Sequence, residues 1–365
     1  MSIEKVLEKT DNGTVSLTRE DILSLLQASS AEKKLLYERA DDIRYRRLGD
    51  DVHLRGIIEF SNHCYSNCLY CGLRAENRAV SRYRMDPGEI LSAARTAAGM
   101  GLKTVVLQSG QDPYYTKETL VDIISAIKGE LDVAVTLSLG IRPESELVAF
   151  REAGADRYLL KHETADPDLF AALRPGTGLG ERIGCLRALK DMGYQVGSGN
   201  IIGLPGQTAD TLARDLLLLR ELDVEMAGIG PFVPNPDTPL GSYPRGGLEA
   251  TLTAIAVARL LLPQAHIPAT TALGTMHPHG RRLALQCGAN VVMPNVTPRK
   301  YRPHYSIYPN KLGYDKDPQI SVDEIRSFVL DMGRVPGSGY GHSPRWSGPP
   351  YGRGEGNRFG LQSGE

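Results

Sequence analysis

Short apolar runs alternate with longer amphipathic segments through most of this chain, and this alternation restricts the fold more than any other feature of the sequence. The amphipathic segments have helical periodicity and charged faces, and they are residues 87–99, 117–128, 144–153, 182–192 and 209–222. The apolar runs are residues 57–60, 104–107, 134–137, 158–160, 196–202, 226–230, 267–271 and 290–293. Such β-α units over roughly 250 residues predict an α/β protein with a closed (β/α)8 barrel of the TIM type.

The ends of the chain differ in composition from this central region. Thr18 is a suitable N-cap for a helix that carries Ile22, Leu25 and Leu26 at helical spacing, so residues 1–50 are predicted to form an N-terminal helical segment. Residues 51–330 are assigned to the barrel. Residues 331–365 form a C-terminal extension rich in Gly and Pro, which we expect to be disordered because it cannot bury enough apolar surface.

Three cysteines follow the first apolar run with the spacing C-x3-C-x2-C, at Cys64, Cys68 and Cys71. Active sites of parallel barrels lie at the carboxyl ends of the strands, which is where this loop is expected. Three thiolates can hold three corners of a cubane iron–sulfur cluster and leave one iron open. The alternatives are a zinc site completed by His63 or His53, or buried free cysteines.

Composition restricts the partners and the compartment. A net charge of -1 and a pI near 6.7 provide no overall attraction to nucleic acid or to an anionic membrane, so the partners are expected to be small molecules or proteins. We expect neither a signal peptide nor a membrane helix, because no stretch approaches ~20 apolar residues. Five cysteines, three of them in cluster spacing, indicate a reducing cytoplasm, with Cys185 and Cys287 as buried thiols.

The cysteine spacing, with Tyr70 before the last sulfur, closely resembles that of the radical S-adenosylmethionine (SAM) enzymes. The resemblance implies that the open iron binds the amino and carboxylate groups of SAM, and that the reduced cluster releases a 5'-deoxyadenosyl radical. Residues 199–203 read G-x-I-x-G and resemble the element that borders the adenine of SAM in these enzymes.

Longer segments between residues 20 and 330 resemble the FeFe-hydrogenase maturase HydE family. They include residues 58–62, 69–74, 83–85, 106–110, 136–140, 154–160, 162–164, 224–239, 267–272 and 287–291. The resemblance implies a radical SAM barrel that acts in assembly of the diiron subcluster of FeFe-hydrogenase. Its radical would attack sulfur in a cysteine-bound iron carbonyl cyanide precursor supplied by a partner maturase.

The same resemblance assigns residues to the site. The implied cofactors are a 4Fe-4S cluster and SAM. The residues implied to contact SAM are Gln108, Thr136, Ser138, Glu163, Arg182 and Ile201. The implied chamber for a small anionic substrate that contains sulfur or iron comprises Arg157, Lys161, Met226, Thr270, Thr271, Tyr305 and Tyr308. Lys161 departs from an arginine expected there, which keeps the charge but loses the planar bidentate geometry.

Some members of the family carry a second cysteine triad near the C-terminus, whereas residues 311–317 of this chain contain no cysteine. We therefore expect one cluster, held by three cysteines, and transient contacts with other hydrogenase maturases. Three alternatives remain open: a methylornithine-synthase-like mutase, a biotin-synthase-like enzyme, and an iron–sulfur cluster scaffold or carrier without turnover.

Overall fold

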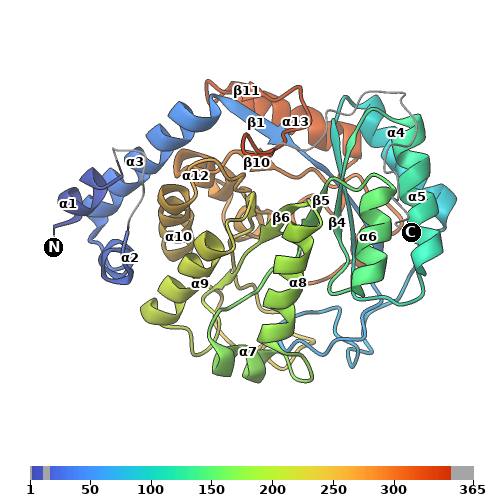
Figure 1. Ribbon diagram of the computed structural model, residues 1–365, viewed down its shortest axis with the longest axis horizontal. Coiled ribbons are helices and arrows are strands. Elements are labelled where there is room, and N and C mark those ends of the chain that lie inside the picture. Colours follow the sequence, from blue (N-terminus) through green and yellow to red (C-terminus); the bar gives the residue numbers. More distant parts are fainter. Residues whose placement is uncertain (1, 11–16, 347–365) are drawn as a thin grey trace, which may run out of the picture.

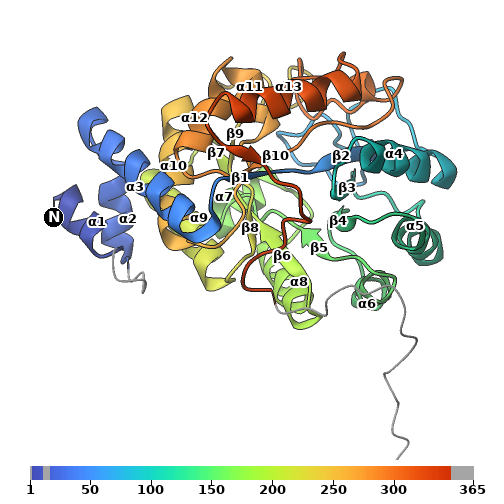
Figure 2. The same ribbon diagram turned by 90° about the horizontal axis from the view of Figure 1, so that it is seen from above.

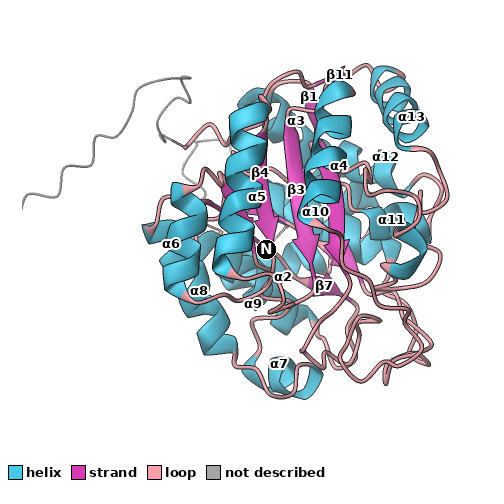
Figure 3. Ribbon diagram, turned by 90° about the vertical axis from the view of Figure 1, so that its right-hand side faces the viewer, coloured by secondary structure: helices cyan, strands magenta, loops and turns pink. Residues whose placement is uncertain are grey.

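A six-stranded parallel sheet forms the centre of the computed structural model, which describes residues 2–10 and 17–346 (Figure 1). Its strands, in spatial order, are β2 (Gly56–Ser61), β3 (Thr104–Ser109), β4 (Ala134–Ser138), β5 (Arg157–Leu159), β6 (Gln195–Ser198) and β8 (Met226–Ala227). The helices lie outside the strands (Figure 3). This is the α/β architecture that the alternating pattern predicts.

The helices begin where the sequence supplies capping residues. Thr18 and Asp21 form a capping box at α2, and Asp86 with Pro87 begins α4. All five predicted amphipathic segments are helical. The helices are α1 (Ile3–Glu8), α2 (Arg19–Leu26), α3 (Ser30–Leu48), α4 (Pro87–Gly99), α5 (Lys117–Glu130), α6 (Glu144–Glu152), α7 (Pro167–Leu173), α8 (Leu179–Asp191), α9 (Ala209–Glu221), α10 (Leu248–Leu261), α11 (Thr271–Met276), α12 (Gly280–Gln286), η1 (Arg302–His304) and α13 (Pro318–Leu330).

Two smaller sheets accompany the central one. The first has the order β10-β1-β11, with β1 at Asp51–Leu54, β10 at Val291–Val292 and β11 at Val335–Pro336. The second pairs β7 (Ile201–Ile202) with β9 (Gly230–Pro231). Three isolated parallel bridges connect the residues that follow β8 with the two edge strands of the central sheet and with β10. They pair Met226 of β8 with His266, Val291 of β10 with Pro268, and Ile57 of β2 with Asn295.

The prediction of a strand at residues 267–271 is wrong. Among these residues only one isolated bridge forms, between Pro268 and Val291, because Pro268 has no N–H to donate to a ladder and Thr270 is already the N-cap of α11. The runs 196–202 and 226–230 are each divided into two short strands rather than one, as β6 with β7 and β8 with β9.

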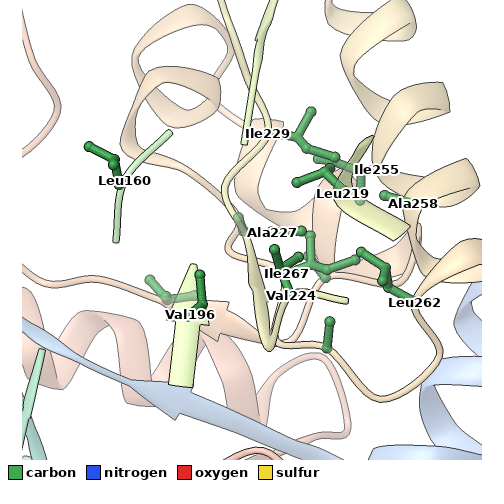
Figure 4. Packing of buried hydrophobic residues seen from close by; sticks show 14 of the residues in the cluster. Leu160, Val196, Leu219, Val224, Ala227, Ile229, Ile255, Ala258, Leu262 and Ile267 are labelled. Carbon is green, nitrogen blue, oxygen red and sulfur yellow. The ribbon is translucent and has the colours of Figure 1, made fainter. Parts of the chain in front are cut away.

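The core fills the space between the strands and the outer helices. Figure 4 shows this packing, where Leu219 of α9 and Ile255 of α10 lie near Ile229 and Ala227. These side chains are fully or almost fully buried. Burial of such apolar surface fixes the helices against the sheet and so positions the loops that follow the strands. No helix in the described part of the chain is long and apolar enough to cross a membrane.

The prediction that the C-terminal extension is disordered is wrong for residues 331–346. β11 pairs with β1, and the following residues run past the amino-terminal ends of the strands (Figure 2). There Arg157, the first residue of β5, donates to Tyr340 O at 2.6 Å and contacts His342 Nδ1 at 2.9 Å, while Ser343 N donates to Gln195 Oε1 at 2.7 Å. The remainder of the predicted tail, residues 347–365, lies outside the described residues.

Candidate functional site

A cavity of about 390 Å³ lies at the carboxyl ends of the parallel strands. Its walls come from the loop after β2, from the ends of β3 and β4, from the segments after β5 and β6, and from residues near α11 and η1. The predicted site residues that line it are Cys64, Cys68, Cys71, Gln108, Thr136, Ser138, Lys161, Glu163, Arg182, Ile201, Met226, Thr270, Thr271, Tyr305 and Tyr308.

The cysteine loop is held by backbone contacts with two neighbouring loops. Gln111 N donates to Cys64 Sγ at 3.4 Å, and Gly72 N donates to Ile307 O at 2.8 Å. Gly110 packs so closely that a Cβ there would lie 2.2 Å from His63 O and 2.7 Å from Cys64 Cβ. The glycine is therefore required for this close approach.

The chemistry of the donor set fits an iron–sulfur cluster. Burial raises the pKa of Cys68 and of Cys71, so binding of iron as the thiolate would release protons. Across the described residues no three His, Cys, Asp or Glu side chains form a group that could hold one metal ion. A cubane needs more widely separated sulfurs than a single ion does, and three cysteine side chains line this one cavity.

Several described residues that line the cavity have a buried polar atom without a hydrogen-bond partner. Among these atoms are Thr136 Oγ1, Glu163 Oε2 and Arg182 Nη1. Glu163 adopts a left-handed backbone with φ 68, a conformation that costs a non-glycine residue about 1–3 kcal/mol and is concentrated at functional sites. Lys161 Nζ lies 3.5 Å from Glu163 Oε2 without forming a hydrogen bond. A donor, an acceptor and a hydroxyl that lack hydrogen bonds in one cavity match a ligand with both amino and carboxylate groups, as SAM has.

Arg182 is aimed at the cavity from α8. Its Nε donates to Lys161 O, which leaves Nη1 free to bind a ligand. Burial, followed by repulsion from Arg174, lowers the pKa of Arg182. Two buried guanidinium groups that repel each other favour a bound anion between or beside them.

Other polar groups that line the cavity already have hydrogen-bond partners within the protein. Met226 Sδ accepts a hydrogen bond from Arg55 Nη1 at 2.9 Å, and Tyr305 Oη accepts one from Gln108 Nε2 at 3.1 Å. Thr270 Oγ1 accepts from Leu273 N at 3.4 Å as the N-cap of α11, so this hydroxyl already has a structural role.

Arg157 does not belong to this cavity. It is fully buried at the amino-terminal end of β5 and donates to Thr104 Oγ1 at 3.2 Å as well as to the C-terminal segment. The structure therefore does not bring Arg157 together with the other predicted substrate residues.

Sequence reasoning missed several residues that line the cavity, among them Arg55, Arg174, Phe232, His266 and Lys311. Lys311 reaches Glu59 of β2 as a buried ion pair, and its ammonium lies 4.9 Å from the centre of the Tyr305 ring. Only the folded chain brings these residues to the cavity, since they are scattered over more than two hundred positions. Phe232 lies within residues 224–239, a segment that resembles the family, and this was the one feature of the sequence that could have indicated a role in the site.

Comparisons with known proteins agree with this geometry. Residues 58–219 match the model of the Radical SAM superfamily. The chain is 48% identical to the FeFe hydrogenase maturase subunit HydE of Thermotoga maritima over 346 residues, which is 94% of this chain and 99% of that protein. The crystal structure of methylornithine synthase is 29% identical, with a TM-score of 0.81, and the match covers 91% of this chain and 97% of that one.

A second solved structure, HydG, a maturase of the FeFe-hydrogenase, shares the fold at 18% identity, with a TM-score of 0.80 and coverage of 92% of this chain and 76% of that one. Membership of the superfamily implies a 4Fe-4S cluster and SAM. The cysteine loop, the cavity and the extent of the similarity together show that this chain is a radical SAM enzyme and belongs to the FeFe hydrogenase maturase HydE family.

Proposed function

We propose that this enzyme generates a 5'-deoxyadenosyl radical from SAM in the maturation of FeFe-hydrogenase, in assembly of its active-site diiron subcluster. The observation that carries the proposal is one cavity lined by three cysteines and by the unpartnered polar atoms of Thr136, Glu163 and Arg182. The high identity to a hydrogenase maturase over almost the whole chain supports the choice of pathway.

The proposed cluster is a single 4Fe-4S cluster with Cys64, Cys68 and Cys71 as its protein ligands. Cys185, half-buried on α8, and Cys287, buried after α12, do not line the cavity. Single cysteines outside the cavity are poor candidates for a second cluster, because such a cluster takes several thiolate ligands.

When bound, a reduced cluster with SAM on its open iron supplies the primary carbon radical. In our proposal, Arg182 Nη1 donates to the carboxylate of SAM, while its Nε remains bound to Lys161 O and so fixes the orientation of the guanidinium. Glu163 Oε2 accepts from the amino group or the ribose of SAM. Thr136, Gln108 and Ser138 at the ends of β3 and β4, with Ile201 of β7, complete this half of the cavity.

The proposed substrate is small, anionic and contains sulfur or iron. The cavity volume of about 390 Å³ supports a small molecule rather than a macromolecule. Lys161, Met226, Thr271, Tyr305 and Tyr308 would contact it, and Thr270 would act mainly by holding α11. We propose a cytoplasmic location and transient contacts with other hydrogenase maturases, without nucleic acid or membrane partners.

We also propose that the strands close into the eight-stranded barrel of the TIM type. The backbone bridges of His266, Pro268 and Asn295 support this, since they lie between β8, β10 and β2. In this scheme residues 1–50 form the helical segment and residues 51–330 the barrel.

The direct test is anaerobic reconstitution followed by assay of SAM cleavage. We expect about four iron atoms per chain and release of 5'-deoxyadenosine with a reductant. Cys64→Ser, Cys68→Ser and Cys71→Ser should each abolish both, whereas Cys185→Ser and Cys287→Ser should change neither. In cells, the wild-type chain should restore active FeFe-hydrogenase to a strain that lacks its own maturase of this type.

The similarity to methylornithine synthase supports a mutase as the second candidate. Conversion of lysine to methylornithine, together with failure to restore the hydrogenase, would assign the enzyme to that reaction. Binding of SAM without any deoxyadenosine under reducing conditions would instead indicate a cluster scaffold or carrier.

A further inference from the structure

Arg174 is a buried cation that is not hydrogen-bonded to a carboxylate in the described part of the chain. It follows α7, is only 5% exposed and lines the cavity together with Cys68 and Cys71. Its Nε has no hydrogen-bond partner among the described residues, and its Nη1 donates to the phenol of Tyr70 rather than to a carboxylate. Because an uncompensated buried charge is strongly unfavourable, the compensating negative charge is expected to come from whatever the cavity binds.

The guanidinium of Arg174 is fixed relative to the cysteine loop. Arg174 Nη1 donates to Tyr70 Oη at 2.7 Å, and its central carbon lies 5.5 Å from the centre of the Phe170 ring. Next to this contact, Leu69 N donates to Leu173 O at 2.9 Å. Tyr70 lies between two of the cysteines in sequence and is itself buried, so a movement of the guanidinium would require movement of the cysteine loop.

Arg174 differs from Arg182, the other buried arginine in this half of the cavity. Arg182 is already bound to the carbonyl of Lys161 and points a free Nη1 toward the position proposed for the SAM carboxylate. Arg174 is instead bound to a residue of the cysteine loop. The ionisable groups that attract it are Tyr70, Cys68 and Glu163, and one of these is a proposed cluster ligand.

Reduction adds one electron, and thus one negative charge, to a cluster that three thiolates already make anionic. A cation held beside the ligands in a low-dielectric cavity stabilises the more negative state more than the less negative one. We propose that Arg174, held by Tyr70, is a positioning residue that raises the reduction potential of the cluster. The electron comes from a one-electron, low-potential donor such as a reduced flavin or iron–sulfur protein, which is oxidised, and no bond breaks in this step.

This inference rests on the proposed function, since it requires the cluster, but its test needs neither substrate nor hydrogenase. The test is a redox titration of the anaerobically reconstituted protein without SAM, followed by EPR of the reduced cluster. The variants are Arg174→Gln, Arg174→Lys and Tyr70→Phe. The matched control is Arg187→Gln, which removes the same charge from an exposed position on α8 that pairs with Glu221.

We expect Arg174→Gln to lower the midpoint potential by about 59 mV, which is a tenfold change in the ratio of reduced to oxidised cluster for one electron. Arg174→Lys keeps the charge and should remain near the wild-type value. Tyr70→Phe should give a smaller shift in the same direction, because the cation stays but is no longer fixed. Arg187→Gln should leave the potential unchanged.

A full iron content in Arg174→Gln together with the wild-type potential would overturn the inference, and so would equal shifts in the Gln and Lys variants. If Arg174→Gln takes up no cluster, Tyr70→Phe decides the question, and an unchanged potential in that variant overturns it. Failure of the wild-type chain to form a 4Fe-4S cluster would be a different result, because it would contradict the proposed function itself.

Discussion

Substitution of Arg182 tests the SAM half of the cavity most directly. Its side chain is 6% exposed, and Nη1 is a buried donor without a partner among the described residues. Arg182→Gln keeps a polar side chain but shortens it, and it removes the charge and the guanidinium donors. The neighbouring Thr136 provides a matched comparison, because its hydroxyl is also buried and unpartnered, and Thr136→Val removes it with little change of volume.

The magnitudes follow from the kind of contact that each group can make. Loss of a buried, charge-assisted contact costs about 3 kcal/mol, which corresponds to a SAM dissociation constant about 100-fold higher. Loss of a neutral hydrogen bond costs about 1 kcal/mol, or about fivefold. The expected order of affinity is therefore wild type, then Thr136→Val, then Arg182→Gln.

The assay is anaerobic calorimetric titration of SAM into the reconstituted protein, with iron content measured in the same samples. Arg187→Gln serves as the control for loss of one positive charge from α8. An Arg182→Gln variant with full iron whose affinity stays within about threefold of wild type, equivalent to about 0.7 kcal/mol, would remove Arg182 from the SAM site.

Three further predictions concern the frame around the site. Lys311→Met should lower the free energy of unfolding in urea by about 3 kcal/mol, because it leaves Glu59 buried without its ion pair. Adding Glu59→Gln in the same chain should recover most of that loss. A double variant whose loss equals the sum of the two single losses would contradict this. Burial lowers the pKa of His162 from 6.5 to about 3, so only the unfolded chain takes up a proton at this residue as the pH falls from 6.5 toward 3, and stability is lost over that range. His162→Gln should therefore reduce the difference in unfolding free energy between pH 7 and pH 5 by about 2 kcal/mol. An unchanged difference would refute the assignment. Gly110→Ala should prevent full cluster loading, measured as iron per chain, because the new Cβ would lie 2.2 Å from His63 O. Normal loading would show that the cysteine loop moves freely. The control is Gly129→Ala, where the new Cβ has open space.

Local features of this protein were predictable from the sequence because they depend on neighbouring residues. The helix starts at Thr18 and Asp86 follow from side chains that cap the first turn, and the five amphipathic helices follow from the spacing of their apolar residues. The cysteine spacing places three sulfurs in one loop after a strand, whatever the rest of the chain does. All the site residues that the sequence and the family resemblance predicted, except Arg157, line the cavity.

Other features depended on contacts between distant parts of the chain. Arg157 and Lys161 were predicted to share one chamber, but they are four positions apart along an extended segment, a span of about 13 Å, and Arg157 faces the opposite end of the strands. Residues 336–346 have the composition of a disordered tail. They nevertheless pack against the strands, because buried Arg157 and Arg55 need acceptors, and the carbonyls of Tyr340 and Gly341 provide them.

The charge balance of the cavity was likewise decided only by the tertiary structure. No sequence motif surrounds Arg174, and the one feature that distinguishes residues 311–317, which include Lys311, is that they contain no cysteine. Folding buries both cations beside the cavity, one against Tyr70 and the other against Glu59. The energy of a buried charge depends on which opposite charges and dipoles lie within a few ångströms, and that is a property of the packed chain rather than of the sequence order.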